Sequence, residues 1–175
     1  MSRMPILLLP LCVIACSDEP AAPTVSLPLT PEFTVGSGVT GERLAQATFA
    51  IRKLKRINKE YDWQVELKAK PALDIAVRRF TYAAGSQTGW HMHPGPVFIQ
   101  VVSGTVIFYE APDCKRIEVR AGESYLDLGE HAHIGRNETG EPAQDVTVLF
   151  GPPGINPDDL REDVSPAPCE LPVLD

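Results

Sequence analysis

Short runs in which apolar and polar residues alternate, separated by glycine or proline, fill most of the chain from about residue 42 to residue 150. Trp63, Val65 and Leu67, for example, alternate with polar neighbours. Successive side chains on a strand point to opposite faces, so this two-residue period predicts half-buried strands. Because no helical period separates the runs, they predict an all-β sandwich or barrel with little helix.

The most apolar part of this pattern lies near the middle of the chain. Residues 97–102 and 105–109 flank Ser103-Gly104, and two apolar runs around a glycine-containing turn predict a hairpin. Further strands are predicted at residues 63–68, 75–78, 116–119, 124–128, 131–136 and 145–150. With 175 residues, 43% of them hydrophobic, the chain is long enough for one compact core.

The formal net charge of −7 argues against a nucleic-acid partner, because binding phosphates requires a basic face. One local basic run, Arg52, Lys53, Lys55, Arg56 and Lys59, interrupts the acidic sequence. It is interpreted as solvated surface, and contact with anionic lipid head groups is the alternative.

The N-terminus has the features of an export signal. Arg3 precedes an apolar run at residues 6–15, which is too short for a permanent membrane span. The run ends in Val13-Ile14-Ala15-Cys16, which resembles the bacterial lipoprotein box, although Val13 stands where leucine is usual. The resemblance implies lipidation of Cys16 and anchoring at the bacterial cell envelope or periplasm. The alternative is an ordinary cleaved signal with an incidental cysteine.

Composition divides the rest of the chain. After the signal peptide at 1–16, residues 17–41 are proline-rich and predict an extended tether. The β-barrel is expected at 42–151, and a proline-rich tail at 152–175. If Cys12 leaves with the signal and Cys16 carries lipid, the two remaining cysteines are Cys114 and Cys169. Disulfides persist outside the cytoplasm, so we expect these two to pair, with unpaired thiols as the alternative.

Two His-x-His sequences carry the most chemical information. His91 and His93 lie two residues apart, so they would point to the same face of a strand. His131 and His133 repeat the spacing in a second predicted strand. Imidazole is a common metal ligand near neutral pH, and a metal site needs a third ligand beside the first pair. His133 is the candidate for that ligand.

The spacings around these histidines resemble the cupins, a family of small jelly-roll β-barrels. Gly85, His91, His93 and Gly104 reproduce the spacing of the first cupin motif, but Val97 occupies the position of its metal-binding glutamate. Gly122, His133 and Asn137 are in register with the second motif, in which Leu128 and Glu130 replace the usual proline and glycine. The resemblance covers Gly85 to Asn137 and implies a single cupin-type jelly-roll barrel.

The resemblance also implies that His91, His93 and His133 bind a divalent transition metal ion, which could be Fe, Mn, Ni, Cu or Zn. The alternative is that these histidines are interior or rim hydrogen-bonding groups in a barrel that lost its glutamate. His131 could replace Val97 as the fourth ligand; Glu130 and Gln87 are weaker substitutes.

Three functions fit such a site. Three-histidine centres without the glutamate resemble those of thiol and diketone dioxygenases, which implies a metal-dependent oxidoreductase acting on a small chelating molecule. A lipid-anchored module that binds or senses a small molecule without converting it is the second. A lyase or isomerase is the third; it needs an acid or base, for which Glu130, His131 and Tyr82 are the candidates. The family resemblance further implies that two barrels can associate as a homodimer.

Overall fold

The computed structural model describes residues 33–51, 53–70, 72–167 and 169–174. The expected signal peptide, the lipidation site Cys16 and most of the expected tether therefore lie outside the described residues. Strands dominate the described part, and one 3-10 helix, η1 (Pro157–Leu160), accompanies them. The strands are β1 (Phe33–Val35), β2 (Ser37–Phe49), β3 (Lys53–Asn58), β4 (Trp63–Lys68), β5 (Leu73–Gln87), β6 (His91–Met92), β7 (Val97–Ser103), β8 (Thr105–Glu110), β9 (Lys115–Arg120), β10 (Ser124–Asp127), β11 (His133–Arg136), β12 (Ala143–Gly151) and β13 (Glu162–Asp163).

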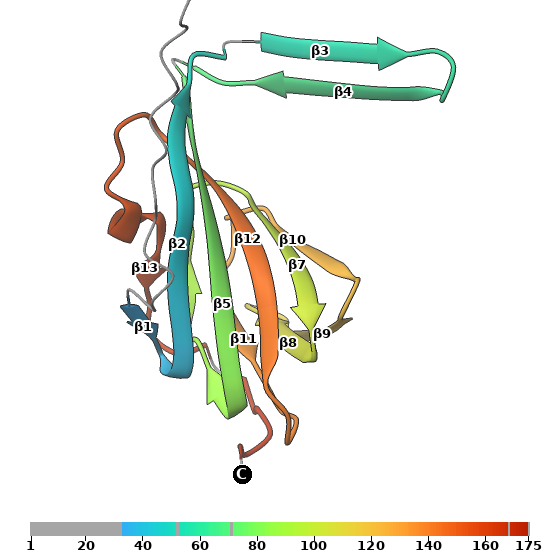
Figure 1. The fold of residues 1–175 in the computed structure, drawn as a ribbon. Coiled ribbons are helices and arrows are strands. Elements are labelled where there is room, and N and C mark those ends of the chain that lie inside the picture. The colour runs from blue at the N-terminus through green and yellow to red at the C-terminus, as the bar shows by residue number, and fades with distance from the viewer. Residues whose placement is uncertain (1–32, 52, 71, 168, 175) are drawn as a thin grey trace, which may run out of the picture.

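The strands form a barrel from two layers of antiparallel pairs (Figure 1). One layer runs β10-β7-β12-β5-β2, and β1 pairs with β2 at its edge. The other contains β9, β8, β11, β6 and β13, and the pairing of Arg136 with Gln87 joins it to β5. This arrangement confirms the predicted all-β jelly-roll barrel with little helix. In the described part of the chain, no helix has the length and hydropathy of a membrane span.

Strand β5 shows how the sequence pattern builds the barrel interior. Its alternate residues Asp74, Ala76, Arg78 and Tyr82 are buried, while Arg79 is only partly buried and reaches Glu42 on β2. Strand β12, which pairs with β5 over its full length, has the same alternation of buried and half-buried residues. Two of the buried positions on β5, Asp74 and Arg78, carry charge, and burying a charge is costly unless it is paired or hydrogen-bonded.

The hairpin predicted from residues 97–109 does not form. Strand β7 pairs with β10 and β12, whereas β8 pairs with β9 and β11, so the two runs belong to different layers. Gly104 makes the crossing between them at a φ of 68°, and a Cβ there would lie 2.7 Å from the carbonyl oxygen of Pro142. Both runs are strongly apolar because each contributes to the barrel core, and a local turn pattern cannot distinguish this from a hairpin.

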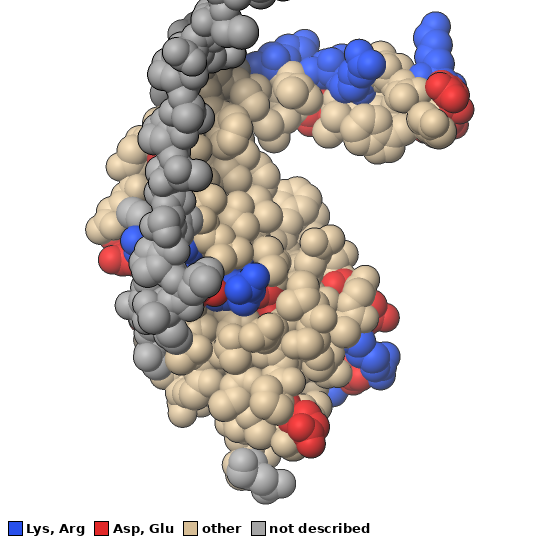
Figure 2. Space-filling model, viewed as in Figure 1, with Lys and Arg blue, Asp and Glu red and all other residues tan. Residues whose placement is uncertain are grey.

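Strands β3 and β4 form a separate two-stranded sheet that projects from the barrel as an arm (Figure 1). Figure 2 shows Lys and Arg side chains gathered along one side of this arm. The described residues of the basic run are exposed, as expected for a solvated surface. The prediction that residues 63–68 are half-buried is wrong, since Trp63 is 53% exposed. The alternation of apolar and polar residues at 63–68 belongs to an amphipathic arm and not to a strand that covers the core.

Both ends of the described chain carry more regular structure than the sequence predicts. Strand β1 and the start of β2 fall in residues 33–41, which were expected to be tether. In the expected proline-rich tail, η1 and β13 form, and β13 pairs with β6. This short pairing places the tail beside the first His-x-His sequence.

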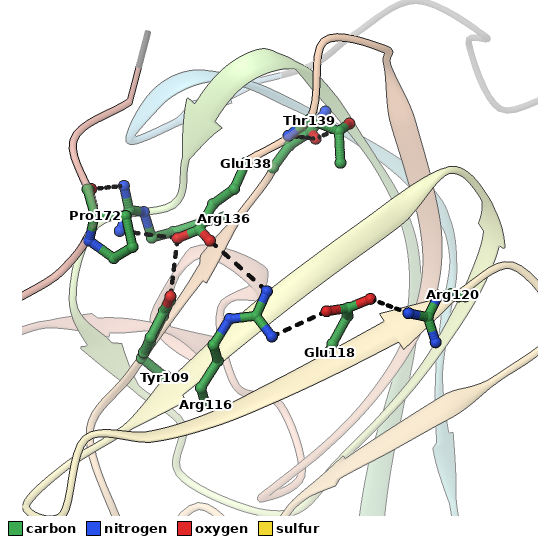
Figure 3. Close-up of polar contacts among 9 residues, drawn as sticks. Tyr109, Arg116, Glu118, Arg120, Arg136, Glu138, Thr139 and Pro172 are labelled. Carbon is green, nitrogen blue, oxygen red and sulfur yellow. Dashed lines mark hydrogen bonds and ion pairs between the residues drawn. The ribbon is translucent and has the colours of Figure 1, made fainter.

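The tail is also attached to the second layer of the barrel. Cys114 and Cys169 form the expected disulfide, 55 residues apart in sequence. A closed loop of that length is worth about 4 kcal/mol in the chain-entropy estimate. Arg136 donates a 2.6 Å hydrogen bond to the carbonyl oxygen of Pro172 and pairs with Glu138, which accepts a hydrogen bond from Tyr109 (Figure 3).

Candidate metal centre

Three histidines from two separate segments meet inside the barrel. His91 begins β6, His93 follows that strand, and His133 begins β11, where it is the paired neighbour of His91. The ring centroids of His91 and His133 lie 4.3 Å apart, and each is within 5.3 Å of the His93 ring. One ring nitrogen of each lies within 4.8 Å of the others, a geometry that could hold one metal ion. We call these three residues the histidine cluster.

Hydrogen bonds at Nδ1 decide which nitrogen could bind a metal. Nδ1 of His91 lies 2.9 Å from the carbonyl oxygen of Gly89, and Nδ1 of His93 lies 2.6 Å from that of Leu160. A carbonyl oxygen only accepts, so in each pair Nδ1–H donates. In a neutral ring this leaves the Nε2 lone pair available for a metal, the arrangement usual for metal-binding histidines.

His133 has a carboxylate close to its Nδ1. Its Nδ1 lies 3.6 Å from Oδ2 of Asp127, while Oδ1 of the same carboxylate accepts a hydrogen bond from the backbone N–H of Gly129. At 3.6 Å the pair is too long for a hydrogen bond, but the carboxylate favours the tautomer with the proton on Nδ1. Because both residues are buried, Asp127 is placed to orient the third ring.

Burial keeps the histidine cluster neutral. Desolvation lowers the pKa of His93 to about 4 and that of His133 to about 3, and it holds the pKa of His91 well below its usual value. The positive charge of nearby Arg161 adds to the depression at all three rings. Near neutral pH all three imidazoles are therefore unprotonated, which is the form that binds metal ions.

The cluster opens into a cavity of about 300 Å³ inside the barrel. This volume is at the lower end of the usual range for small-molecule sites. Much of its wall is apolar, and Val97, which occupies the glutamate position of the first cupin motif, is part of that wall. The polar part of the wall includes Arg78, Tyr82, Asp145, Thr147 and Arg161.

A hydrogen-bonded carboxylate lies in this polar part of the wall. The Tyr82 hydroxyl donates to Oδ2 of Asp145 at 2.9 Å, and the Thr147 hydroxyl donates to Oδ1 at 2.9 Å. Burial raises the pKa of Asp145 to about 7 and raises that of Tyr82 well above its usual value. Near neutral pH the phenol of Tyr82 therefore keeps its proton, which it donates to Asp145, and its oxygen can still accept a hydrogen bond in the cavity.

The other residues predicted to take part in the site are not brought to it. His131 and Glu130 are exposed, and neither lines the cavity. Gln87 is partly buried at the end of β5, where it pairs with Arg136, and it also does not line the cavity. Of the three acid–base candidates, Tyr82 alone reaches the cavity. Strand β11 begins at His133, so the regular alternation of side chains does not extend back to His131.

Four charged residues of the site were not predicted from the sequence: Arg78, Asp127, Asp145 and Arg161. Three of them lie on strands at buried positions. On β5 and β12 the buried face is the more polar one, since Ile75 and Val77 of β5 and Val146 and Val148 of β12 are only partly buried, so the alternation alone could not have identified these charges. Arg161 could not be identified either, because it lies in the tail and only the packing of η1 and β13 brings it to the cavity.

Known proteins and one family model match parts of this chain. Residues 78–149, which include the whole histidine cluster, match the family model described as "Cupin domain". No curated protein matches the chain. Among solved structures, a conserved protein of unknown function from Streptococcus pyogenes is 20% identical, with a TM-score of 0.40, and the match covers 45% of this chain and 65% of that one.

Two further structures match over more of this chain. A Cupin 2 conserved barrel domain protein from Leptotrichia buccalis is 20% identical with a TM-score of 0.45, covering 65% of this chain and 41% of that one. DMSP lyase DddQ from Ruegeria pomeroyi DSS-3 is 16% identical with a TM-score of 0.44, covering 51% and 42%. The match covers less than two thirds of each of these structures.

Proposed function

We propose that this protein, whose residues 78–149 match the cupin-domain family model, binds a transition metal ion through His91, His93 and His133 and acts on a small molecule beside it. The observation that carries the proposal is the convergence of three neutral imidazoles, with the Nδ1 of two of them engaged by carbonyl oxygens, at the wall of a cavity. The activity we propose is that of a metal-dependent oxidoreductase of the dioxygenase type.

The residues present fit a metal with open coordination positions. Three imidazoles satisfy only part of the coordination of a divalent ion, and Val97 offers no ligand atom. A bound ion would supply Lewis-acid or redox chemistry at that place. Imidazole nitrogens suit Fe, Mn, Ni, Cu and Zn to different degrees, and the general affinity order favours Cu. The ion present in the cell then depends on supply as well as on affinity.

Polar residues in the cavity wall can contact the ligand directly. Tyr82 presents a hydroxyl that Asp145 and its neighbour Thr147 hold in one orientation. Because the proton of this hydroxyl is donated to Asp145, its oxygen is free to accept a hydrogen bond from a ligand. The apolar walls exclude water around the ligand, which strengthens these polar contacts.

A second candidate is a binding or sensing protein that converts nothing. It is supported by the exposed positions of Glu130 and His131, so that of the three acid–base residues predicted from the sequence Tyr82 is the one that lines the cavity. The same positions weaken the lyase or isomerase reading. In either case we propose export, with lipid anchoring at Cys16 in the cell envelope or periplasm, on the basis of the sequence alone. Mass spectrometry of the mature N-terminus tests that part.

Metal analysis of protein purified without oxygen tests the proposed site. We expect close to one equivalent of transition metal in the native chain and little in the His91→Ala/His93→Ala variant. His131→Ala is the matched control, because this exposed histidine should leave the metal content unchanged. Equal metal content in the native chain and the double variant would overturn the proposal.

Oxygen consumption then separates the two candidate functions. Iron-loaded protein is tested with a panel of chelating acids and thiols. Uptake that depends on both substrate and the histidine cluster supports the oxidoreductase. Tight binding of one of these compounds with no uptake supports the binding protein.

A further inference from the structure

Two central strands of the barrel have apolar residues on their outer face. On β12, Asp145 and Thr147 are buried and line the cavity. The residues that alternate with them, and therefore face outward, are Val146, Val148 and Phe150. Strand β5 repeats this inversion. A sheet with water on one face normally turns polar residues to that side, so apolar residues on the outer face indicate a sheet that is covered on both sides.

The outward apolar residues form a row across all five strands of the layer β10-β7-β12-β5-β2. In order, and each paired with the next, they are Leu126, Phe98, Val148, Val77 and Ala45. In the neighbouring row Phe150 pairs with Ile75, and the ring centroids of Phe98 and Phe150 lie 5.4 Å apart. Phe98 is 49% exposed and Leu126 is 47% exposed. We call these residues the apolar band.

The arm formed by β3 and β4 carries a second apolar surface. The register of the two strands puts Leu54, Trp63, Val65 and Leu67 on one side of this small sheet. The first three of these side chains are exposed. The other side carries Glu66 and the lysines that pair with it. An isolated two-stranded sheet is marginally stable in water, so a partner on its apolar side would stabilise the arm.

A second copy of the chain matches these surfaces in charge. Residues 53–70 contain six Lys or Arg and three Asp or Glu, whereas the whole chain has a net charge of −7, so a basic arm is attached to an acidic barrel. The arm of one copy and the barrel of another therefore attract each other. The arm extends beyond its own barrel (Figure 1), and acidic side chains lie at its tip (Figure 2), where Glu60 and Asp62 precede β4. An anionic membrane would repel this tip, which makes a membrane the poorer partner.

The area of the two surfaces also fits a dimer. Five strands about 4.8 Å apart, with two rows of outward residues about 7 Å apart, give the apolar band an area of roughly 350 Å². The arm, with two strands of six residues, adds roughly 200 Å². Band and arm on both copies would together bury on the order of 1,100 Å², which exceeds the roughly 1,000 Å² expected of a specific interface. The band alone would not reach that area.

We propose that two copies of this chain associate about a two-fold axis, with apolar band packed on apolar band and the arm of each copy on the barrel of the other. A surface that meets its own copy about such an axis needs only to complement itself, and two sheets can pack face to face in this way. The interface uses the outer face of the layer, whereas the histidine cluster lies inside the barrel. The inference therefore does not rest on the proposed metal or activity.

Sedimentation equilibrium of the full chain tests the association. Every protein carries Cys16→Ser, so that association through a lipid is excluded. We expect a dimer with a dissociation constant in the micromolar range or below. Phe98→Lys/Leu126→Lys should be monomeric, because the dimer would bury its added charges without partners. Thermal denaturation of each variant detects a loss of fold; if this variant does not fold, Phe98→Ala/Leu126→Ala should still weaken the dimer at least tenfold.

A variant of the arm and a control complete the test. Trp63→Ser/Val65→Ser should weaken the dimer at least tenfold, whereas Val173→Lys, at a position in the tail that is 91% exposed, should dimerise like the native chain. A monomeric native chain would overturn the inference, and so would an arm variant that dimerises like the native chain. Binding to vesicles of phosphatidylglycerol and phosphatidylcholine by a protein that stays monomeric would assign the arm to a membrane and also overturn it.

Discussion

Nδ1 of His93 lies 2.6 Å from the carbonyl oxygen of Leu160, 67 residues further along the chain. The Leu160 side chain is 1% exposed and packs so closely on β12 that a Cβ at Gly151 would lie 2.8 Å from its Cδ2 atom. The tail is therefore part of the candidate metal centre, because it fixes the orientation of one of the three rings.

Leu160→Ala should weaken both the fold and the metal site. Deleting a buried leucine side chain costs roughly 2–5 kcal/mol of unfolding free energy. The carbonyl that orients His93 would lose its anchor, and we expect metal affinity to fall tenfold or more. Urea denaturation and titration against a chelator measure the two effects. Val119→Ala, in the core, should lose stability without losing metal affinity; equal loss of metal affinity in both variants would show that the tail has no specific role.

Val97→Glu should make stability depend on metal. The side chain at this position lines the cavity, so a glutamate there would bury a carboxylate beside the histidine cluster. Without metal, an uncompensated buried carboxylate costs several kcal/mol, and a bound ion would offset that cost. We expect the melting temperature of metal-free Val97→Glu to fall and to recover on adding Zn. Val101 is also buried on β7, and the melting temperature of Val101→Glu should fall and should not recover on adding Zn. The same response in both variants would contradict this assignment.

Asp127→Asn should reduce metal affinity while leaving the fold intact. The amide keeps an oxygen for the N–H of Gly129, but it loses the negative charge 3.6 Å from Nδ1 of His133. Changes of this kind to groups that orient a ligand typically cost 10–100-fold in affinity, as measured by chelator competition. The matched control is Asp74→Asn, another buried aspartate that accepts a hydrogen bond from a glycine N–H, here Gly154. An unchanged affinity in Asp127→Asn would remove Asp127 from the site.

Asp145→Asn should change how stability depends on pH. Burial raises the folded-state pKa of Asp145 from 3.8 to about 7, so the folded protein holds this proton over a pH range in which the unfolded chain has released it. The favourable contribution of the protonated form is present below about pH 4 and is lost as pH rises to about 7, an effect on the order of 4 kcal/mol. The unfolding free energy of Asp145→Asn, relative to that of the native chain, should therefore rise between pH 4 and pH 7. Above pH 7 the difference between the two proteins should be constant.

Urea denaturation of metal-free protein at several pH values measures this difference. The comparison with the native chain matters because the histidine cluster also titrates, and its contribution is common to both proteins. Thr81→Val, on the outer face of β5, provides a control for a local loss of hydrogen bonding, because it should show no such trend. A stability difference that does not vary with pH would mean that Asp145 is ionised in the folded state.

Local patterns predicted much of this molecule. The two-residue alternation marked most strands of the barrel, since a strand with one buried face must alternate whatever its partners are. The spacing of His91, His93 and His133 identified the rings that the structure brings together. The cysteines left after the export signal predicted the observed disulfide. Each of these inferences depends on a short stretch of chain or on a count of residues. Both can be read from the sequence without knowing which segments meet in the fold.

The failures share one cause. The apolar runs around Gly104 were predicted to form a hairpin, and His131 was treated as equivalent to His133. Both predictions failed because the local sequence does not determine with which other strand a strand pairs. Residues 63–68 alternate on an exposed arm just as they would on a core. Arg161 and the carbonyl of Leu160 reach the cavity only through the packing of the tail. Which charges face the cavity, and which carbonyls hold the rings, is decided by contacts between distant segments, and those contacts exist only once the two layers have closed on each other.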